Sequence, residues 1–259
     1  MNKIKIHNKN DFKSMRKVGK LAAEVLDFIN DYISEGITTT EINNLCHQYI
    51  LKNEAISAPL NYNGYPKSTC ISINHVVCHG VPSEKKLNEG DILNIDISVI
   101  INGWHADSSR MYYVGKKITI EAKKLIKTTY NAMMSSIKMI RPGTKFNEIG
   151  KSIEGFIYCH NYSIVKEYCG HGIGKIFHTA PNILHYYDKK QEDIIKEGMF
   201  FTIEPMINIG IQETKLLKDK WTVITKDKNL SAQFEHTVGV TSDRGEIFTK
   251  SLKNIECPF

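Results

Sequence analysis

The stretch ILNIDISVIINGWHADSSRMYYVG, residues 92–115, contains the strongest local signal for the fold of this chain. Asn102-Gly103 stands between two apolar runs, and this dipeptide in that setting predicts a β-hairpin closed by a two-residue type I′ turn. In such a hairpin Ile101 pairs with Trp104, and the register of both strands follows from that pair. The sequence therefore predicts two long antiparallel strands.

Two aspartates of this hairpin are expected on the same face of the sheet. Asp96 would lie opposite Ser109, and Asp107 opposite Ser98, so the alternation of side chains makes the aspartates diagonal neighbours about 7–8 Å apart. Two unpaired carboxylates on an inner face are costly without a cation, and a divalent metal would remove that cost. They could instead be polar positions on a solvated face, although the surrounding apolar residues favour a buried site.

The chain contains two segments of similar organisation. Residues 11–34 and 119–140 both carry apolar side chains at helical spacing, and each is followed by a glycine and a second expected helix. Further on, EGDILNID at 89–96 resembles EGMFFTIE at 197–204, a shift of 108 residues, and each run ends in a carboxylate. The pattern indicates a duplication, with a site on the pseudo-twofold axis that receives a carboxylate from each half.

The fold class expected from these patterns is α+β, with paired helices backing a largely antiparallel sheet. No linker rich in proline, glycine or serine separates the halves. We therefore expect a single catalytic domain over residues 1–259, with an internal pseudo-repeat of roughly 11–110 and 118–240.

The composition is that of an ordinary globular protein, with 41% hydrophobic and 24% charged residues. No apolar run approaches the roughly 20 residues that span a bilayer, and the polar, basic N-terminus lacks the apolar core of a secretory signal. The six cysteines are scattered without a CxxC pair, which suits a reducing compartment. We therefore expect a cytoplasmic protein with no membrane partner.

The net charge of +6, from 34 basic and 28 acidic side chains, leaves two interpretations open. The charge can be spread over a solvated surface, or it can form a basic face for an RNA-rich partner such as the ribosome. No run of basic residues concentrates it. The sequence therefore favours at most a weak ribosome association and no specific nucleic-acid site.

Three further residues can join the two aspartates in a metal site. Glu204 ends a strand-like run at Pro205, Glu235 lies in the strand-like run SAQFEHTVGV, and His171 lies in the glycine-rich CGHGIG. Alone, Glu235 could be a surface residue, and the histidine a structural or surface one. Together, four carboxylates and one imidazole make an oxygen-rich set suited to a pair of divalent ions such as Mn, Fe(II), Co or Zn.

Six segments of the chain carry a resemblance to a known family. They are NGYPKSTCISIN (63–74), VVCHGVP (76–82), NIDISVIINGWHADSSRMY (94–112), EYCGHGIGKIFH (167–178), FTIEPM (201–206) and SAQFEHTVGV (231–240). In this order, and covering nearly the whole chain, they resemble the type I bacterial methionine aminopeptidases. Motifs of this length and number are highly specific. The resemblance implies the pita-bread fold, whose two pseudo-symmetric halves agree with the internal repeat.

The resemblance assigns a role to each candidate metal ligand. It implies that one ion is bound by Asp96, Asp107 and Glu235, and the other by Asp107, His171, Glu204 and Glu235. Asp107 and Glu235 would therefore bridge the two ions.

The resemblance also implies the reaction, which is removal of the N-terminal methionine from nascent proteins and peptides with a small second residue. A hydroxide held by two metal ions would attack the scissile carbonyl, with Glu204 as general base and then acid. His178 would stabilise the oxyanion, and His79 would contact the scissile nitrogen. Without the surrounding motifs, both histidines could equally be structural.

A pocket for the methionine side chain is implied as well, built from Tyr62, Tyr65, Cys70, Phe177 and Trp221. Aromatic rings and a thiol suit a polarizable thioether, although the same residues could be ordinary core aromatics. Pro59 departs from the small residue, often cysteine, that many relatives carry beside this pocket, and it leaves the shape of the pocket floor open.

Related activities fit the sequence less well. Prolidases and aminopeptidase P carry an extra N-terminal domain, and type II methionine aminopeptidases carry an insertion of tens of residues, whereas only 26 positions separate His178 from Glu204. The alternative outside catalysis is a binding module of the same fold that has lost its metals. All five ligands and both histidines are present, which favours the enzyme. We expect it to be a monomer.

Overall fold

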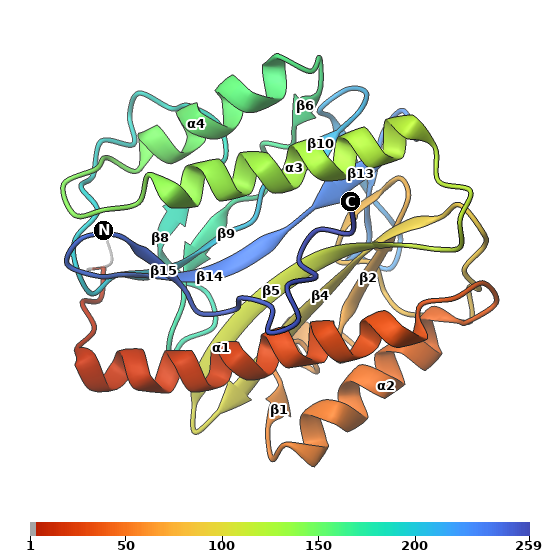
Figure 1. Ribbon diagram of the computed structural model, residues 1–259, viewed down its shortest axis with the longest axis horizontal. Coiled ribbons are helices and arrows are strands. Elements are labelled where there is room, and N and C mark those ends of the chain that lie inside the picture. Colours follow the sequence, from red (N-terminus) through yellow and green to blue (C-terminus); the bar gives the residue numbers. More distant parts are fainter. Residues whose placement is uncertain (1–3) are drawn as a thin grey trace.

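Four helices lie in two pairs over the main sheet of the computed structural model, which describes residues 4–259 (Figure 1). The first pair is α1 (Lys9–Ile29) and α2 (Thr39–Lys52), and the second is α3 (Ile120–Lys138) and α4 (Asn147–Tyr158). The first helix is shorter than the expected 11–34 at its C-terminal end. The chain tightens there into a 3₁₀ turn, η1 (Asn30–Tyr32), before the second helix.

Side-chain caps explain where three of these helices begin. Asn8 and Asp11 form a capping box at the start of α1, in which each side chain accepts a hydrogen bond from the backbone of the other. Thr38 and Glu41 do the same at α2. The expected cap at Thr119 is confirmed, since its hydroxyl accepts the N–H of the third residue of α3. Such caps contribute typically about 1 kcal/mol each.

The predicted hairpin is confirmed. Strands β4 (Ile92–Ile101) and β5 (Trp104–Tyr113) pair in the expected register, in which Ile101 faces Trp104 and both aspartates face their expected serines. The two residues of the Asn102-Gly103 turn have φ values of 50° and 78°, the positive values that a type I′ turn requires.

The main sheet has nine strands and takes them from both halves of the chain. Its order is β1-β4-β5-β14-β9-β7-β8, with β2 also paired to β4 and β15 to β14, and these pairings are antiparallel. Two three-stranded sheets, β13-β10-β6 and β11-β12-β3, accompany it. The remaining bounds are β1 Ile56–Ser57, β2 Cys70–Ile73, β3 Val76–Cys78, β6 Ser163–Ile164, β7 Gly170–Gly172, β8 Thr179–Ile183, β9 Phe200–Ile203, β10 Met206–Asn208, β11 Thr214–Leu216, β12 Val223–Thr225, β13 Ser231–Gln233, β14 Glu235–Val240 and β15 Gly245–Ile247.

The run 231–240 contains two strands instead of the single one expected. Phe234 separates β13 from β14, and the two strands belong to different sheets. Glu235 is therefore the first residue of a strand of the main sheet. This position places its side chain beside β5, where it pairs with Ser109.

Each helix pair covers its own hydrophobic core. Met15 of α1 and Ile42 of α2 belong to the first core, and Leu125 of α3 and Ile149 of α4 belong to the second. The pairing of β5 with β14 joins the two halves in one sheet. The expectation of a single domain, of which residues 1–3 lie outside the described part, remains a prediction. Within residues 4–259, no helix has the length and apolar character to cross a membrane.

Candidate metal centre and substrate pocket

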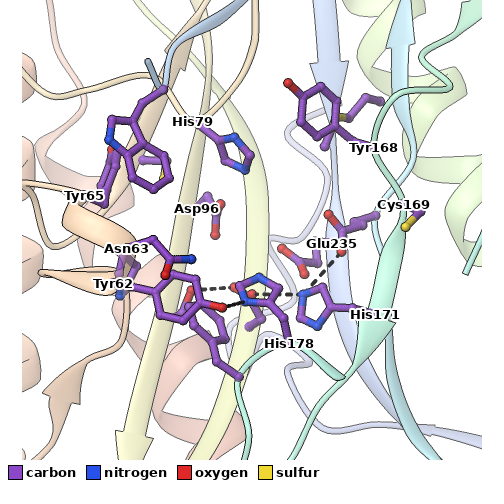
Figure 2. A pocket seen from close by; sticks show the side chains of 18 of the residues that line it. Tyr62, Asn63, Tyr65, His79, Asp96, Tyr168, Cys169, His171, His178 and Glu235 are labelled. Atoms are coloured by element: carbon purple, nitrogen blue, oxygen red, sulfur yellow. Dashed lines mark hydrogen bonds and ion pairs between the residues drawn. The ribbon is translucent and has the colours of Figure 1, made fainter. Parts of the chain in front are cut away.

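The five candidate metal ligands come from five neighbouring strands. Asp96 lies on β4, Asp107 on β5 and His171 on β7, while Glu204 directly follows β9 and Glu235 begins β14. The side chains converge in the space between the two halves of the sheet, where Figure 2 labels Asp96, His171 and Glu235. The sheet order thus brings together residues that are up to 139 positions apart in the sequence.

The donor atoms of these residues form overlapping groups. In one group the oxygens of Asp96, Asp107 and Glu235 lie within 4.8 Å of one another, and in another the donors of His171, Glu204 and Glu235 do so. His171 Nε2 lies 3.7 Å from both Asp107 Oδ2 and Glu204 Oε1. The structure therefore assembles the whole expected set, and the assignment of each residue to a particular ion stays a prediction.

Burial and the neighbouring carboxylates disfavour the ionised form of two carboxyl groups of the cluster. Burial, followed by the neighbouring carboxylates Asp107 and Glu204, raises the pKa of both Asp96 and Glu235 well above the usual range. Asp96 Oδ1 and Glu235 Oε1 are buried without a hydrogen-bond partner among residues 4–259. Orphaned carboxylate oxygens beside one imidazole are the donor set that divalent first-row metal ions prefer, so the residues fit such ions.

Glu204 and Asp107 differ in the direction of their pKa shifts. Burial raises the pKa of Glu204 to about 7, because burial and the charge of Asp107 outweigh the opposing effects of His171 and a hydrogen bond from Thr202. Burial acts on Asp107 in the same direction, but contacts with His171 and Ser98 outweigh it and lower the pKa of that carboxyl. Neighbouring carboxyl groups of different acidity are typical of catalytic sites.

Two threonines missed by the sequence analysis form hydrogen bonds with the candidate ligands. Thr202 Oγ1 accepts the N–H of His171 at 2.9 Å and donates to Glu204 Oε1 at 2.6 Å. Thr237 Oγ1 accepts the N–H of Asp107 at 3.0 Å and donates to its carbonyl oxygen at 2.7 Å. Each threonine lies two residues from a ligand on the same stretch, so the alternation of side chains could have identified both.

His185 is a third residue that the sequence analysis missed. Its buried Nε2 accepts the N–H of Glu204 at 3.0 Å, at the point where β9 has ended and Pro205 offers no backbone donor. No local pattern in the sequence marks this histidine, because its partner lies 19 positions away.

The candidate ligands lie at the base of a cavity of about 420 Å³. All the residues expected at the substrate line it: Tyr62, Tyr65, Cys70, His79, Phe177, His178 and Trp221. Pro59 lies in the same wall. Tyr168, Cys169 and Met206, which were not expected, complete the opposite wall, and Figure 2 shows Tyr168 and Cys169 across the cavity from the tyrosines. Their positions inside the motifs EYCGHGIGKIFH and FTIEPM were the available signal.

Aromatic rings in edge-to-face contact make the wall rigid. Tyr65 and Trp221 lie 5.1 Å apart at 79°, and Tyr62 and Phe177 lie 5.0 Å apart at 68°. Such pairs are favourable beyond the area that they bury. The Tyr65 hydroxyl donates to the carbonyl oxygen of Thr69 at 2.9 Å, which fixes that ring from behind.

The two expected histidines are held differently. His79 has a φ of 54°, a left-handed backbone that is unusual for a residue with a side chain and is common at functional sites. Burial lowers the pKa of His79. Burial, and next the charge of nearby His171, lower the pKa of His178 to about 4, so both side chains are neutral near pH 7. His178 contacts the Tyr62 hydroxyl through Nδ1 at 3.0 Å.

Known proteins resemble this chain over nearly its whole length. The profile of Metallopeptidase family M24 matches residues 13–242. A methionine aminopeptidase of Rickettsia prowazekii is 56% identical over 256 residues, covering 98% of both chains, and one of Escherichia coli K12 is 48% identical, covering 95% of this chain and 94% of its own. The crystal structure of methionine aminopeptidase from Rickettsia prowazekii superposes with a TM-score of 0.94 at 57% identity, covering 96% of this chain and all of that one, which confirms the expected α+β pita-bread fold. This chain belongs to metallopeptidase family M24, in its group of methionine aminopeptidases.

Proposed function

We propose that this chain hydrolyses the first peptide bond of peptides and nascent proteins that begin with methionine and have a small second residue. The observation that carries the proposal is the cluster of four carboxylates and one imidazole at the base of a cavity walled by aromatic rings and a thiol. Membership of a metallopeptidase family supports hydrolysis that depends on divalent metal.

The ligand set suits two ions. Asp96, Asp107 and Glu235 would hold one, and Asp107, His171, Glu204 and Glu235 would hold the other. Two divalent charges balance the four carboxylates, and Mn, Fe(II), Co and Zn all suit these donors. When bound, such ions supply an activated water and a polarised scissile carbonyl.

The side chains of the protein move the protons. The Thr202 hydroxyl donates to Glu204 Oε1 and so orients this carboxylate, which would take the proton of the attacking water and return it to the leaving amine. His178 donates an N–H to the oxyanion as it develops. His79, directed into the cavity by its left-handed backbone, contacts the departing nitrogen.

The cavity selects the first residue of the substrate. Methionine is linear and polarizable, and its sulfur gains from contact with the edges of aromatic rings such as Tyr65 and Trp221. Cys70 adds a second soft atom beside this side chain. A charged first residue would have to lose its hydration among these aromatic rings, which disfavours it against methionine.

The proposal also includes the cellular location, the oligomeric state and the partners of the enzyme. The enzyme would act in the cytoplasm as a monomer, on the N-termini of nascent chains, with at most a weak ribosome association. A specific nucleic-acid site is not part of this function.

A peptide assay tests the proposal. The purified protein, stripped by a chelator and reloaded with Mn²⁺, should cleave Met-Ala-Ser rapidly, Met-Leu-Ser poorly and Ala-Ala-Ser hardly at all. The chelated protein should be inactive. Equal cleavage of Met-Ala-Ser and Ala-Ala-Ser would show a general aminopeptidase and contradict the assignment.

A further inference from the structure

We propose that Tyr62 is a positioning residue whose hydroxyl holds the His178 imidazole in the tautomer that carries its hydrogen on Nε2. The Tyr62 hydroxyl oxygen lies 3.0 Å from His178 Nδ1, and Figure 2 marks this contact at the cavity. The tautomer of His178 can be measured without any substrate, so this part of the inference does not depend on the proposed function. Only the expected effect on kcat rests on the proposed function.

Tyr62 lies in a turn that is closed by its own backbone hydrogen bonds. The Tyr62 N–H donates to Pro59 O at 2.9 Å, the Tyr65 N–H donates to Tyr62 O at 2.9 Å, and the Asn61 N–H donates to Tyr65 O at 2.8 Å. Asn61 has a φ of 66° and Asn63 one of 49°, a left-handed backbone that asparagine tolerates better than most residues. The short 3₁₀ element η2 (Tyr62–Gly64) therefore has little freedom to move the ring.

Contacts with neighbouring aromatic rings also restrict the Tyr62 ring. It meets Phe177 edge-to-face at 5.0 Å and lies 5.1 Å from the His178 ring. Phe177 and His178 are adjacent in the chain, so one aromatic group contacts both the pocket wall and the catalytic histidine. The turn and this packing together direct the hydroxyl at Nδ1.

The contact by its distance fits either direction, and we take the Tyr62 hydroxyl as the donor because a phenol hydroxyl is a stronger donor than acceptor. A neutral imidazole has one N–H and one bare nitrogen, and the partner of one nitrogen decides where the hydrogen resides. Within residues 4–259, His178 is the only hydrogen-bond partner of the Tyr62 hydroxyl. With that hydroxyl donating to Nδ1, the hydrogen of the ring must be on Nε2, which is then free to donate to the substrate.

Tyr65, the second tyrosine of the pocket, differs from Tyr62 in the partners of its hydroxyl. The single hydroxyl hydrogen of Tyr65 is shared between two backbone carbonyl oxygens, those of Thr69 at 2.9 Å and Gly80 at 3.1 Å, and this shared bond stabilises the wall. Tyr62 is 36% exposed, so water competes for its hydroxyl and the effect on the tautomer is moderate. Tyr65→Phe is therefore a matched control for Tyr62→Phe, since both changes remove one hydroxyl from the same pocket.

Nitrogen NMR of the full chain, labelled with ¹⁵N-histidine and without added metal, reads the tautomer directly. The His178 signals are identified by their loss in His178→Gln, and two-bond ¹H–¹⁵N correlations distinguish the two tautomers. The wild type and Tyr65→Phe should show the Nε2–H pattern, whereas Tyr62→Phe should show a mixture. An Nδ1–H pattern in the wild type, or an unchanged pattern in Tyr62→Phe, overturns the proposal.

Kinetics of the Mn²⁺-loaded enzyme on Met-Ala-Ser test the consequence. Tyr62→Phe should lower kcat about two- to tenfold, the scale of one lost hydrogen bond, and change KM by less than about twofold. In a His178→Ala background the same substitution should leave kcat unchanged; an equal loss in both backgrounds overturns the positioning role. A wild type that shows the Nε2–H pattern but cleaves no methionyl peptide would refute the proposed function and leave the tautomer inference standing.

Discussion

The carboxylate of Asp107 lies between the two groups of candidate ligands. It shares a 4.8 Å group with Asp96 and Glu235, and it lies 3.7 Å from His171 Nε2. Ser98 donates to its Oδ1 at 2.7 Å, which leaves Oδ2 facing the cluster. A change at this one residue therefore affects both groups.

The first prediction follows from that position. Asp107→Asn should nearly abolish cleavage of Met-Ala-Ser and lower the metal content of the purified protein, because a charge shared by both groups is lost. Metal analysis and steady-state kinetics measure the two effects, with the exposed Asp193→Asn as the matched control. A variant that keeps more than about a tenth of the wild-type turnover would exclude the bridging role.

Thr202 supports a second prediction at the scale of single residues. Thr202→Val keeps the shape of the side chain but leaves the His171 N–H and Glu204 Oε1 without their shared partner. Leaving buried polar groups unpaired costs about 1–3 kcal/mol, so kcat/KM should fall about ten- to hundredfold.

Two controls accompany this prediction. Thr202→Ser retains the hydroxyl and should keep most of the activity. Thr129→Val removes a buried hydroxyl that bonds only within α3 and should behave like the wild type. Equal activity of the valine and serine variants at position 202 would show that the hydroxyl has no positioning role.

Among the elements, α1 is tied to the hairpin and to the C-terminal segment by one buried ion pair. Asp27 of α1 lies 2.7 Å from the Arg110 guanidinium of β5, and both side chains are 4% exposed. Asp27 also accepts hydrogen bonds from the Ser251 hydroxyl and from the N–H groups of Leu252 and Lys253. Three elements distant in sequence are therefore linked at one carboxylate.

A prediction about acid stability follows from this pair. Burial raises the pKa of Asp27, but the hydrogen bonds from Ser251 and Arg110 outweigh it and lower the pKa below its usual value of 3.8. A carboxyl whose pKa is lowered by folding stabilises the protein above the unfolded pKa, and this contribution is lost as the pH falls through the folded pKa. The free energy of unfolding should therefore decrease below about pH 4.

Asp27→Asn identifies the source of that dependence. The variant should be less stable at pH 7 by about 3–5 kcal/mol, because Arg110 remains buried without its partner. The difference from the wild type should shrink as the pH falls below 4, measured by urea unfolding across the pH range. Asp31→Asn, at an exposed pair with Lys253, is the control. A difference that is constant with pH would exclude Asp27 as the titrating group.

At the scale of the whole molecule, the lining of the cavity comes from both halves. His79 follows β3 in the first half, His178 precedes β8 in the second, and Trp221 precedes β12. The walls are parts of a packed structure, since Tyr65 and Trp221 are in edge-to-face contact. The space beyond the first residue of a bound peptide is therefore limited by groups that do not move independently.

Selectivity for the second residue of the substrate is the corresponding prediction. In a Met-X-Gly series, Gly, Ala and Ser at X should be cleaved fast, whereas Leu, Lys and Trp must displace a wall at a cost of about 1–3 kcal/mol. This cost corresponds to about a ten- to hundredfold loss in kcat/KM. Leu-Ala-Gly serves as the control for the first position. A flat profile across X would refute the selectivity.

Much of the structure follows from local pattern. The Asn102-Gly103 turn sets the register of β4 and β5, since a two-residue turn permits only one pairing of its flanking residues. Helical spacing and the cap at Thr119 predicted α3 to within two residues at each end, whereas α1 ends five residues before the expected position 34. The five candidate ligands were found because each lies in a long motif. A motif can be recognised however far it lies along the chain from the other motifs.

Only the tertiary structure decided how these residues meet. The order β4-β5-β14-β9-β7 brings the five candidate ligands to one place, and no local pattern specifies which strand of one half lies beside which strand of the other. The contact between Tyr62 and His178 joins positions 116 residues apart. Such contacts depend on packing of the complete chain, because a side chain finds a distant partner only after the backbone around both has been fixed.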